Sequence, residues 1–472
     1  MLTILWFRQD MRLADNPALA EAVARGRVLP VYILDPDLPL GAASRWWLHG
    51  SLEALARDLA GRGVSLVLRR GRPLDVLRML VERTGAGAVH WNRCYEPAAV
   101  ARDQIIKAAL GADGIDARSL GAALLAEPWE LKSGAGEPYK VFTPFWRALA
   151  ARAPFDRPLA APASIAAGPA VPSDDLASWN LRPAHPDWAE GLRACWQPGE
   201  AGAVTRLSHF LECLVANYAA ARDLPAADAT SRLSPHLHWG EISPRQVWAA
   251  ADQAALAAPA SSAGATAFLR ELAWREFSMH LLFHWPDMAT RAWKPAFEEF
   301  PWREDAASLR AWRPGRTGYP IVDAGMRELW ATGYMHNRVR MIVASFLVKD
   351  LLIDWRAGAS WFEDTLVDAD LANNRASWQW VAGSGADAAP FFRIFNPVTQ
   401  GRKFDAAGEY VRRHVPELRH LDARFIHAPW EAPSSVLEAA GVMPGETYPA
   451  PIVDHAEARQ RALAAFAELK RG

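Results

Sequence analysis

The chain has 472 residues, of which 51% are hydrophobic and 22% are charged, and its formal net charge is −1. This length indicates two or three domains, and the composition is that of an ordinary globular protein without an apolar run of the roughly 20 residues that a membrane helix needs. The near-zero charge excludes a strongly basic nucleic-acid binder, although a local basic surface can still contact phosphates. Three scattered cysteines and a first segment without signal-peptide zones lead us to expect a soluble, cytoplasmic protein without a disulfide framework.

Short buried strands alternate with amphipathic helices in the first third of the chain. This alternation predicts a parallel α/β sheet. The strands are expected over Leu2–Phe7, Val28–Leu34, Ser65–Leu68 and Ala88–Asn92, and the helices include Asn16–Ala24 and Arg45–Ala60. No Gly-rich phosphate fingerprint of the Rossmann or Walker type occurs here, so these residues give no reason to place a dinucleotide in this part.

The composition changes to Pro, Ala, Gly and Ser between about Pro154 and Gly202, which is typical of a long connector. Beyond it the pattern is helical almost throughout, over Arg206–Ala221, Pro244–Ala258, Ala265–Phe283, Pro320–Ala331 and Met335–Ile353. We therefore predict a doubly wound parallel-sheet α/β domain over residues 1–130, a linker over 131–203 and an all-helical domain over 204–472.

A run of hydroxyl side chains with one arginine precedes a predicted helix in the helical half. It consists of Thr230, Ser231, Arg232, Leu233 and Ser234. Short hydroxyl groups and free backbone N–H groups at the start of a helix suit a phosphate. The alternative is an ordinary N-cap and turn, which these residues alone favour.

A carboxylate and an indole lie three residues apart at Glu271 and Trp274, so they share a face of a helix. Such a pair can hydrogen-bond to the edge of a nucleobase and stack on its face. The alternative is a Glu–Arg helix pair that covers a core tryptophan, and the residues alone favour that simpler structure.

Asn337 and Met341 share a helix face at a spacing of four, whereas Arg340 lies on another side. Asp368 and Asp370 supply carboxylates with which this arginine could pair. A buried Asp–Arg pair is costly unless a polar ligand or a network completes it. The alternative is a surface loop of Asx turns, which is common.

His236 and His238 have the spacing of a weak metal pair, but no third ligand accompanies them. We therefore interpret both as structural and predict no metal site. Tryptophan is unusually frequent, with 22 residues against 8 tyrosines. Most of these indoles are expected to pack in the core, although an indole can also stack on bases or carry electrons.

Several long strings, in this order, resemble the photolyase and cryptochrome family. They cover essentially the whole chain, which makes coincidence an untenable explanation. The strings are Trp6–Leu13, Tyr139–Phe145, the clusters at Thr230 and Glu271, and a dense region from Gly318 to Asp405 that contains Trp378-Gln379-Trp380 and Phe392–Pro397. The resemblance, which is nearest to bacterial class I cyclobutane pyrimidine dimer photolyases, implies an N-terminal antenna-chromophore domain and a C-terminal helical domain that binds FAD and DNA.

The resemblance implies that FAD, reduced when active, binds in a bent form inside the helical domain. Positions that hold its phosphate and sugar side in the family match Tyr218, Thr230, Ser231, Arg232, Leu233 and Ser234. Positions that hold the flavin ring match Arg340 and Asp368, with Asp370 nearby. Asn374 matches the position that faces flavin N5, where an asparagine can bond the protonated, reduced flavin, while the flavin does the chemistry.

The resemblance also implies a lesion pocket lined by Glu271, Trp274, Asn337, Met341 and Trp380. The dimer is expected to flip out of the duplex, with the two tryptophans as apolar walls and Glu271 and Asn337 as polar partners of the pyrimidine edges. Further contacts with the DNA strand are implied for Arg222, Arg275, Arg338 and Gln400.

Three tryptophans, Trp378, Trp355 and Trp302, match the family's chain of indoles from flavin to surface. In family members that chain reduces an oxidised flavin in light. In the implied repair cycle, excited reduced FAD gives an electron to the dimer, the ring opens and the electron returns. Ring splitting then needs no general base, metal or nucleophile.

The family contains light sensors as well as enzymes, so a non-catalytic cryptochrome is the main alternative. The lesion-pocket residues and the short segment after the helical domain favour an enzyme. Repair of the six-four photoproduct is a second alternative, but those enzymes carry two histidines where this chain has Asn337 and Met341. The single-strand-preferring DASH branch is a third. We expect repair of cyclobutane pyrimidine dimers in UV-damaged DNA.

Many members hold a second, antenna chromophore in the α/β domain, either a folate or a deazaflavin. One folate-binding pattern has Asn-Glu shortly after Tyr-Glu, whereas here Tyr95-Glu96 is followed by Pro97 and two alanines. Trp46 and Trp47 could line another pigment site or simply pack a helix on the sheet. We expect no obligate protein partner and a monomer.

Overall fold

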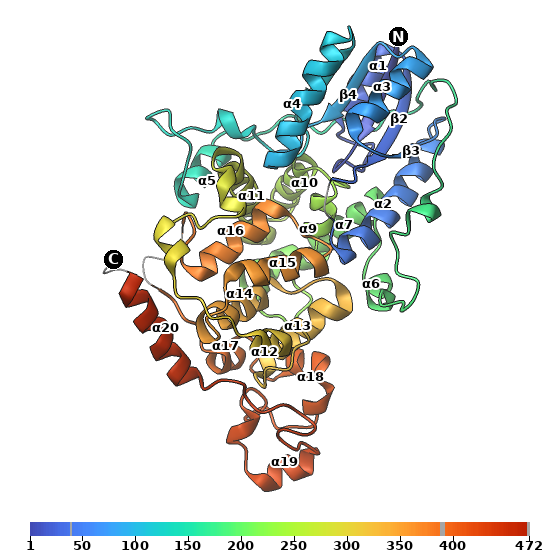
Figure 1. Cartoon of the computed structure of the whole chain (residues 1–472). Helices are drawn as coiled ribbons and strands as arrows, with labels where there is room; N and C mark the ends of the chain where they lie inside the picture. Colours follow the sequence, from blue (N-terminus) through green and yellow to red (C-terminus); the bar gives the residue numbers. More distant parts are fainter. Residues whose placement is uncertain (38–39, 388–391, 470–472) are drawn as a thin grey trace. The chain divides into compact units, whose positions relative to one another are not determined.

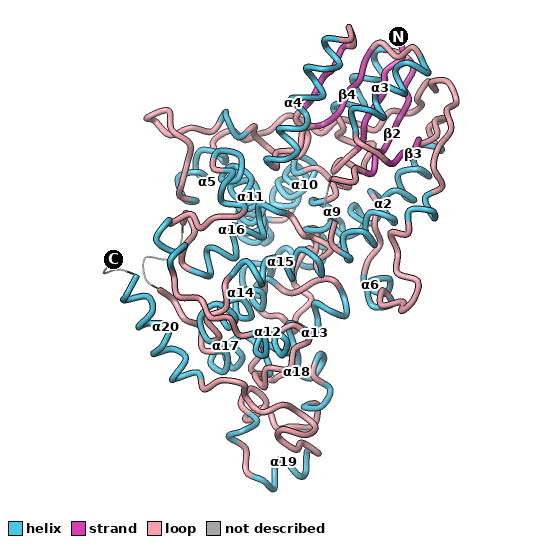
Figure 2. Tube along the Cα trace, in the orientation of Figure 1, coloured by secondary structure: helices cyan, strands magenta, loops and turns pink. Residues whose placement is uncertain are grey.

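The computed structural model describes residues 1–37, 40–387 and 392–469 (Figure 1). These residues divide into two compact units. The first comprises Met1–Ala219, Ser231–Pro286 and Val367–Ala372, and the second comprises Ala220–Thr230, Asp287–Leu366 and Asn373–Gly472. The five-stranded sheet lies wholly in the first unit (Figure 2). The units thus interleave along the chain and do not coincide with the predicted segments 1–130, 131–203 and 204–472.

The sheet is parallel throughout, with strand order β3-β2-β1-β4-β5, which confirms the predicted doubly wound architecture. Its strands are β1 (Leu2–Phe7), β2 (Arg27–Leu34), β3 (Val67–Arg70), β4 (Ala88–Asn92) and β5 (Asp116–Leu120). The sequence prediction missed β5, because this edge strand is short, polar and nowhere fully buried.

Alternate residues of β1 point to opposite faces of the sheet. Leu2, Ile4 and Trp6 join an apolar cluster with α3 (Pro73–Thr84) and α4 (Pro97–Ala112). Helix α1 (Pro17–Arg25) contacts β1 and β4 through residues outside this cluster, and the Asn16 side chain caps it by accepting from Leu19 N at 3.0 Å. Helix α2 (Ala42–Ala60) follows β2.

The predicted linker lies within the first unit. It contains α5 (Phe142–Ala150), η2 (Leu176–Trp179) and α6 (Glu190–Cys195). Between them, Gly168 N donates to Val28 O at 2.9 Å, and Asp174 N donates to Leu68 O at 2.8 Å. Prolines and glycines prevent a continuous ladder here, so the connector follows the sheet through isolated hydrogen bonds.

Helices form the rest of the first unit. They are α7 (Glu200–His209), η3 (Phe210–Leu214), η4 (Val215–Asn217), α8 (Tyr218–Ala221, whose last two residues belong to the second unit), α9 (Ser234–His238), α10 (Pro244–Ala257), η5 (Pro259–Ser261) and α11 (Ser262–His284). Helix α10 starts where Ser243 and Gln246 form a reciprocal capping box and Pro244 occupies the first turn. Helix α11 packs against both α10 and α5.

The second unit is helical in its described residues. Its elements are η6 (Pro286–Ala289, which starts at the last residue of the first unit), η7 (Pro295–Glu299), α12 (Ala306–Trp312), α13 (Pro320–Thr332), α14 (Asn337–Ser345), η8 (Phe346–Asp350), α15 (Trp355–Thr365), α16 (Leu371–Ala382, whose first two residues belong to the first unit), α17 (Pro397–Phe404), α18 (Glu409–His414), η9 (Pro416–Leu418), η10 (Pro429–Glu431), α19 (Ser434–Ala440) and α20 (His455–Leu469). The single helix predicted over Met335–Ile353 is α14 followed by the π-helical turn η8, because Leu351 N bonds back to Phe346 O. No helix among the described residues is long and apolar enough to cross a membrane.

Candidate functional site

The hydroxyl run before α9 is joined to the distant acidic segment within the first unit. Ser234 is the first residue of α9, and its Oγ donates to Asp368 Oδ2 at 2.6 Å. Just before it, Leu233 N donates to Ser231 Oγ at 3.4 Å, and Arg232 has a φ of +51°. The local sequence therefore forms a tight turn, and the fold brings two separately predicted clusters into contact.

The segment around Asp368 and Asp370 is also held by the residues that follow Ser234. Trp239 Nε1 donates to Val367 O at 3.3 Å, and His238 Nδ1 lies 3.9 Å from Asp370 Oδ2. His236 hydrogen-bonds to the fully buried Glu241, which also accepts from Trp47 Nε1 at 3.1 Å. Both histidines thus have a carboxylate neighbour within the first unit. No group of three or more metal-ligating side chains occurs among the described residues.

Trp274 has one ring face covered. It stacks on Phe142 of α5, with ring centroids 3.6 Å apart and an angle of 7° between the planes. This contact was not predicted, although Phe142 lies in one of the resembling strings. Glu271 lies one helical turn earlier on α11 and is half-buried. Only the opposite face or an edge of this indole can therefore meet a base.

Arg275 and Glu276 form hydrogen bonds within the first unit. Arg275 Nη1 donates to Ala123 O at 2.8 Å and to Glu276 Oε1 at 3.2 Å, and its side chain is 15% exposed. The DNA contact predicted for Arg275 stays a prediction, and a phosphate would have to compete with these internal acceptors. Glu276 was not predicted; it accepts from Leu125 N at 2.8 Å, and burial raises its pKa to about 7.

Helix α14 of the second unit carries Asn337 and Met341 four residues apart, and the structure confirms that both lie on one helix. Asn337 is exposed and Met341 is half-buried. Between them, Arg338 Nη2 donates to Asp223 Oδ2 at 2.7 Å, and Arg338 Nη1 lies 3.7 Å from Met341 Sδ. A phosphate that binds Arg338 has to compete with Asp223.

The Arg340 side chain reaches back to the residues that precede α14. Its Nε donates to Met335 O at 2.7 Å, and its guanidinium lies 5.2 Å from the Tyr334 ring centroid. Its predicted partner Asp368 belongs to the first unit, so their pairing stays a prediction. Arg222 follows α8 and Gln400 lies on α17, and both are half-buried. Tyr218 is buried, with its ring edge-on to Phe210 at 5.3 Å.

Asn374 lies on α16 and is bonded to α15. Its Nδ2 donates to Ala359 O at 3.0 Å and to Glu363 Oε1 at 3.2 Å. Trp380 lies on the same helix and is half-buried. Because both N–H groups of the amide have acceptors on α15, the amide oxygen is the part left for a ligand.

The three tryptophans predicted to carry electrons all lie in the second unit. Trp378 and Trp355 are buried, whereas Trp302 is half-buried and packs on Phe300, with ring centroids 4.4 Å apart. Trp302 is the most exposed of the three, as a chain that runs toward the surface requires. Trp312 was missed: it is fully buried and edge-on to Trp378 at 6.3 Å, and no sequence signal distinguishes it from an ordinary core residue.

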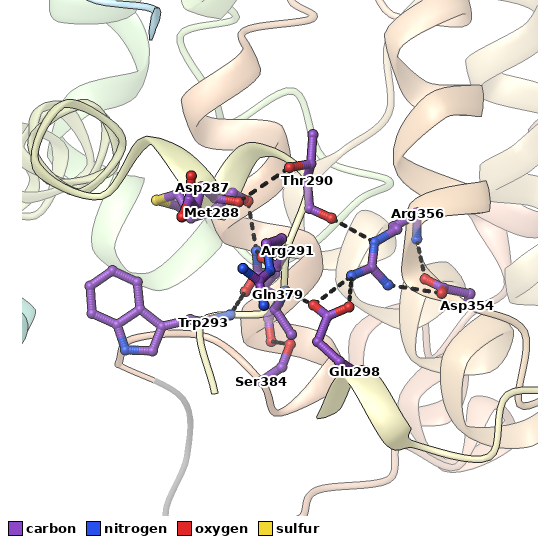
Figure 3. A network of polar contacts seen from close by, with 11 residues as sticks. Asp287, Met288, Thr290, Arg291, Trp293, Glu298, Asp354, Arg356, Gln379 and Ser384 are labelled. Atoms are coloured by element: carbon purple, nitrogen blue, oxygen red, sulfur yellow. Dashed lines mark hydrogen bonds and ion pairs between the residues drawn. The ribbon is translucent and has the colours of Figure 1, made fainter. Parts of the chain in front are cut away.

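Gln379, between Trp378 and Trp380, fixes the end of α16 (Figure 3). Its buried amide accepts from Trp293 N at 2.7 Å and donates to Met288 O and Arg291 O at 2.8 and 3.0 Å. These bonds tie the part of α16 that carries Trp378 and Trp380 to the turn at residues 288–293. In the sequence this glutamine stands out only as part of a resembling string.

Comparison with known proteins gives consistent matches along the whole chain. Residues 3–163 match the family model described as DNA photolyase, and residues 268–468 match the FAD binding domain of DNA photolyase. A deoxyribodipyrimidine photo-lyase of Agrobacterium fabrum is 53% identical over 99% of this chain and 98% of its own length. Cryptochrome-1 of Arabidopsis thaliana is 40% identical over 99% of this chain and 70% of its own length.

The chain belongs to the photolyase and cryptochrome family. A crystal structure of a bacterial class III photolyase from Agrobacterium tumefaciens covers 100% of this chain and 98% of its own chain, with a TM-score of 0.97 and 52% identity. The protein is therefore a photolyase with an FAD-binding domain.

Each unit holds side chains whose chemistry suits FAD. In the first unit these are the hydroxyl groups of Ser231 and Ser234 and the Asp368 carboxylate, and in the second unit it is the oriented amide oxygen of Asn374. FAD supplies the photochemistry when bound. Of the pigment-site candidates, Trp47 is fully buried against Trp196 and His236, which supports its packing role.

Proposed function

We propose that this photolyase repairs cyclobutane pyrimidine dimers in UV-damaged DNA by light-driven electron transfer from reduced FAD. The observation that carries the proposal is the pair Asn337 and Met341, which stand one turn apart on α14. An amide and a thioether at these positions can bond and pack against a pyrimidine dimer. They cannot act as the two histidines of six-four photolyases do.

In this proposal Glu271 and Asn337 bond to the pyrimidine edges, and Trp274 and Trp380 form apolar walls. The stacking of Trp274 on Phe142 supports such a wall, because it holds the indole in one orientation before the lesion enters. Tyr218, Thr230 to Ser234, Arg340, Asp368, Asp370 and Asn374 hold FAD, while Arg222, Arg338 and Gln400 contact the strand. Trp378, Trp355 and Trp302 pass electrons to an oxidised flavin.

The test is repair of a duplex that carries one dimer, with purified reduced protein, under blue light and in darkness. We expect light-dependent restoration of the duplex and no restoration of a six-four photoproduct. The variant Asn337→Ala is expected to lower dimer repair at least tenfold, and Arg310→Ala, a substitution on the exposed side of α12, is the control. Absence of dimer repair by FAD-loaded, reduced protein would overturn the proposal.

A blue-light sensor is the second candidate, because Cryptochrome-1 of Arabidopsis thaliana aligns with 99% of this chain. FAD photoreduction without dimer repair in the same assay would favour it. We further propose that the protein is a cytoplasmic monomer and that it carries a folate or deazaflavin antenna. An absorbance spectrum before and after FAD extraction identifies such a pigment.

A further inference from the structure

We propose that Glu363 is a positioning residue that fixes the amide of Asn374 with its oxygen toward the flavin and thereby favours the reduced cofactor. This inference rests on the proposed function, in which Asn374 holds FAD, and on the family resemblance, which implies that Asn374 faces flavin N5. It assigns a role to a carboxylate that neither the sequence strings nor the comparisons single out.

The orientation of the Asn374 amide depends on its hydrogen bonds. A primary amide has two N–H donors and one oxygen. Both donors are used within the second unit, by Ala359 O at 3.0 Å and by Glu363 Oε1 at 3.2 Å. The orientation of this amide is thus set by two acceptors on one neighbouring helix, α15.

A reversed Asn374 amide would be unfavourable. Rotation by half a turn would place Asn374 Oδ1 against the Ala359 carbonyl and the Glu363 carboxylate. Two hydrogen bonds would then become two oxygen–oxygen contacts, one of them with a charged group. Ala359 O alone gives a weaker preference, so the carboxylate is the stronger of the two orienting groups.

Glu363 is itself held by Arg375. Arg375 Nη2 donates to Glu363 Oε2 at 2.8 Å, and Arg375 Nε lies 2.8 Å from Oε1. The Glu363 side chain is 28% exposed and the Arg375 side chain is 13% exposed. This paired geometry restrains the carboxylate, so that Oε1 keeps its place beside Asn374.

The chemical consequence follows from the two states of flavin N5. The reduced flavin carries N5–H and donates, whereas the oxidised flavin has a bare nitrogen that accepts. An amide oxygen held toward N5 bonds only the first. By orienting Asn374, Glu363 is therefore expected to stabilise reduced FAD relative to oxidised FAD, and reduced FAD is the form that repair requires.

The measurement is the midpoint potential of bound FAD, read by its absorbance in a redox titration. Glu363→Gln allows Asn374 to reverse, because a glutamine can donate to the amide oxygen. We expect roughly a tenfold loss in the preference for reduced FAD, which is about 30 mV toward negative potential for a two-electron couple. The matched control is Glu298→Gln, which also removes a carboxylate paired with an arginine, at 32% exposure, without contact to Asn374.

Two further variants separate this role from a general effect of charge. Glu363→Asp keeps the charge but withdraws the oxygen from Asn374, and we expect it to shift the potential nearly as much as Glu363→Gln. In an Asn374→Ala background, Glu363→Gln is expected to add no further shift. A wild-type potential for Glu363→Asp, or an equal shift in both backgrounds, would overturn the proposal.

The proposed function and this inference fail in different ways. If dimer repair is absent while the potentials change as expected, the repair proposal fails and the role of Glu363 is supported. If Asn374→Ala leaves the potential of FAD unchanged, Asn374 does not face N5 and the positioning role is overturned, whatever the repair assay gives.

Discussion

Glu276 is a buried acid whose proton is retained in the folded state. It accepts from Leu125 N and lies 3.2 Å from Arg275 Nη1, yet burial raises its pKa from an ordinary 4.5 to about 7. Between these two values the folded protein keeps a proton that the unfolded chain has released. Stability from this group is therefore fully present below pH 4.5 and is lost as the pH rises through 7.

The variant Glu276→Gln is expected to remove this pH dependence. The wild-type free energy of unfolding should fall by roughly 3 kcal/mol more than that of the variant between pH 4.5 and 7, at about 1.4 kcal/mol for each pKa unit. Urea unfolding at a series of pH values measures it. Glu130→Gln, at a carboxylate whose side chain is 39% exposed, is the control. Parallel curves for Glu276→Gln and wild type would contradict the prediction.

Asp223 competes with DNA for Arg338 in the proposed function. The two side chains are 36% and 19% exposed and lie 2.7 Å apart. An ion pair of this exposure contributes up to about 1 kcal/mol, so Asp223→Asn is expected to raise affinity for a dimer-containing duplex about two- to fivefold. Fluorescence anisotropy measures it. Equal or weaker binding by the variant would show that Arg338 does not meet a phosphate.

At the scale of elements, helices α15 and α16 meet where a glycine faces an indole. A Cβ at Gly358 would lie 2.1 Å from Cη2 of Trp378, so no larger residue fits without displacement of that ring. Helix α15 therefore needs glycine here although glycine is a poor helix former. The position of the expected inner electron carrier depends on this absence of a side chain.

Gly358→Ala is expected to destabilise the protein by about 1–3 kcal/mol through overpacking and to slow the light-driven reduction of FAD. Thermal unfolding and flavin absorbance under illumination measure the two effects. The same substitution at Gly111 on α4, where nothing lies within 4 Å, should instead stabilise by about 0.5 kcal/mol. A Gly358→Ala protein with wild-type stability and photoreduction would show that Trp378 can shift freely.

The burial and composition of individual elements explain which of them could be predicted from the sequence. The bounds of β1 and β4 match the prediction, because both strands are buried along their whole length and consist mostly of apolar residues. Strand β5 was missed because this partly exposed edge strand is mostly polar. The break between α14 and η8 was missed because apolar residues continue through it, while the change to π-helical bonding depends on packing.

At the scale of the whole molecule, a net charge of −1 leaves affinity for DNA to local arginines. The proposed function gives phosphate contacts to Arg222 and Arg338. Each such contact releases counterions and adds about 0.9 to the salt slope, so the logarithm of the binding constant should fall with a slope of about −1.8 against the logarithm of salt concentration.

Titrations of a dimer-containing duplex at several salt concentrations measure this slope. Arg338→Ala is expected to reduce it by about 0.9 and to weaken binding to damaged and undamaged duplex alike. Arg182→Ala, at an arginine paired with Glu53 in the first unit, should leave the slope unchanged. A wild-type slope near zero would mean that phosphates contribute little to binding.

The sequence by itself determined the parallel sheet with four of its five strands, the helical second half, the family and the identities of the expected flavin and lesion residues. These follow from local periodicity and from strings of residues, which are properties of the chain read in order. Only the tertiary structure decided that Ser234 bonds to Asp368, that Phe142 covers one face of Trp274, that Arg275 is committed to Ala123 O, and that Glu363 and Ala359 O orient Asn374. These contacts join residues up to 152 positions apart, and the free energy that selects them comes from burial and hydrogen-bond geometry that no local pattern encodes.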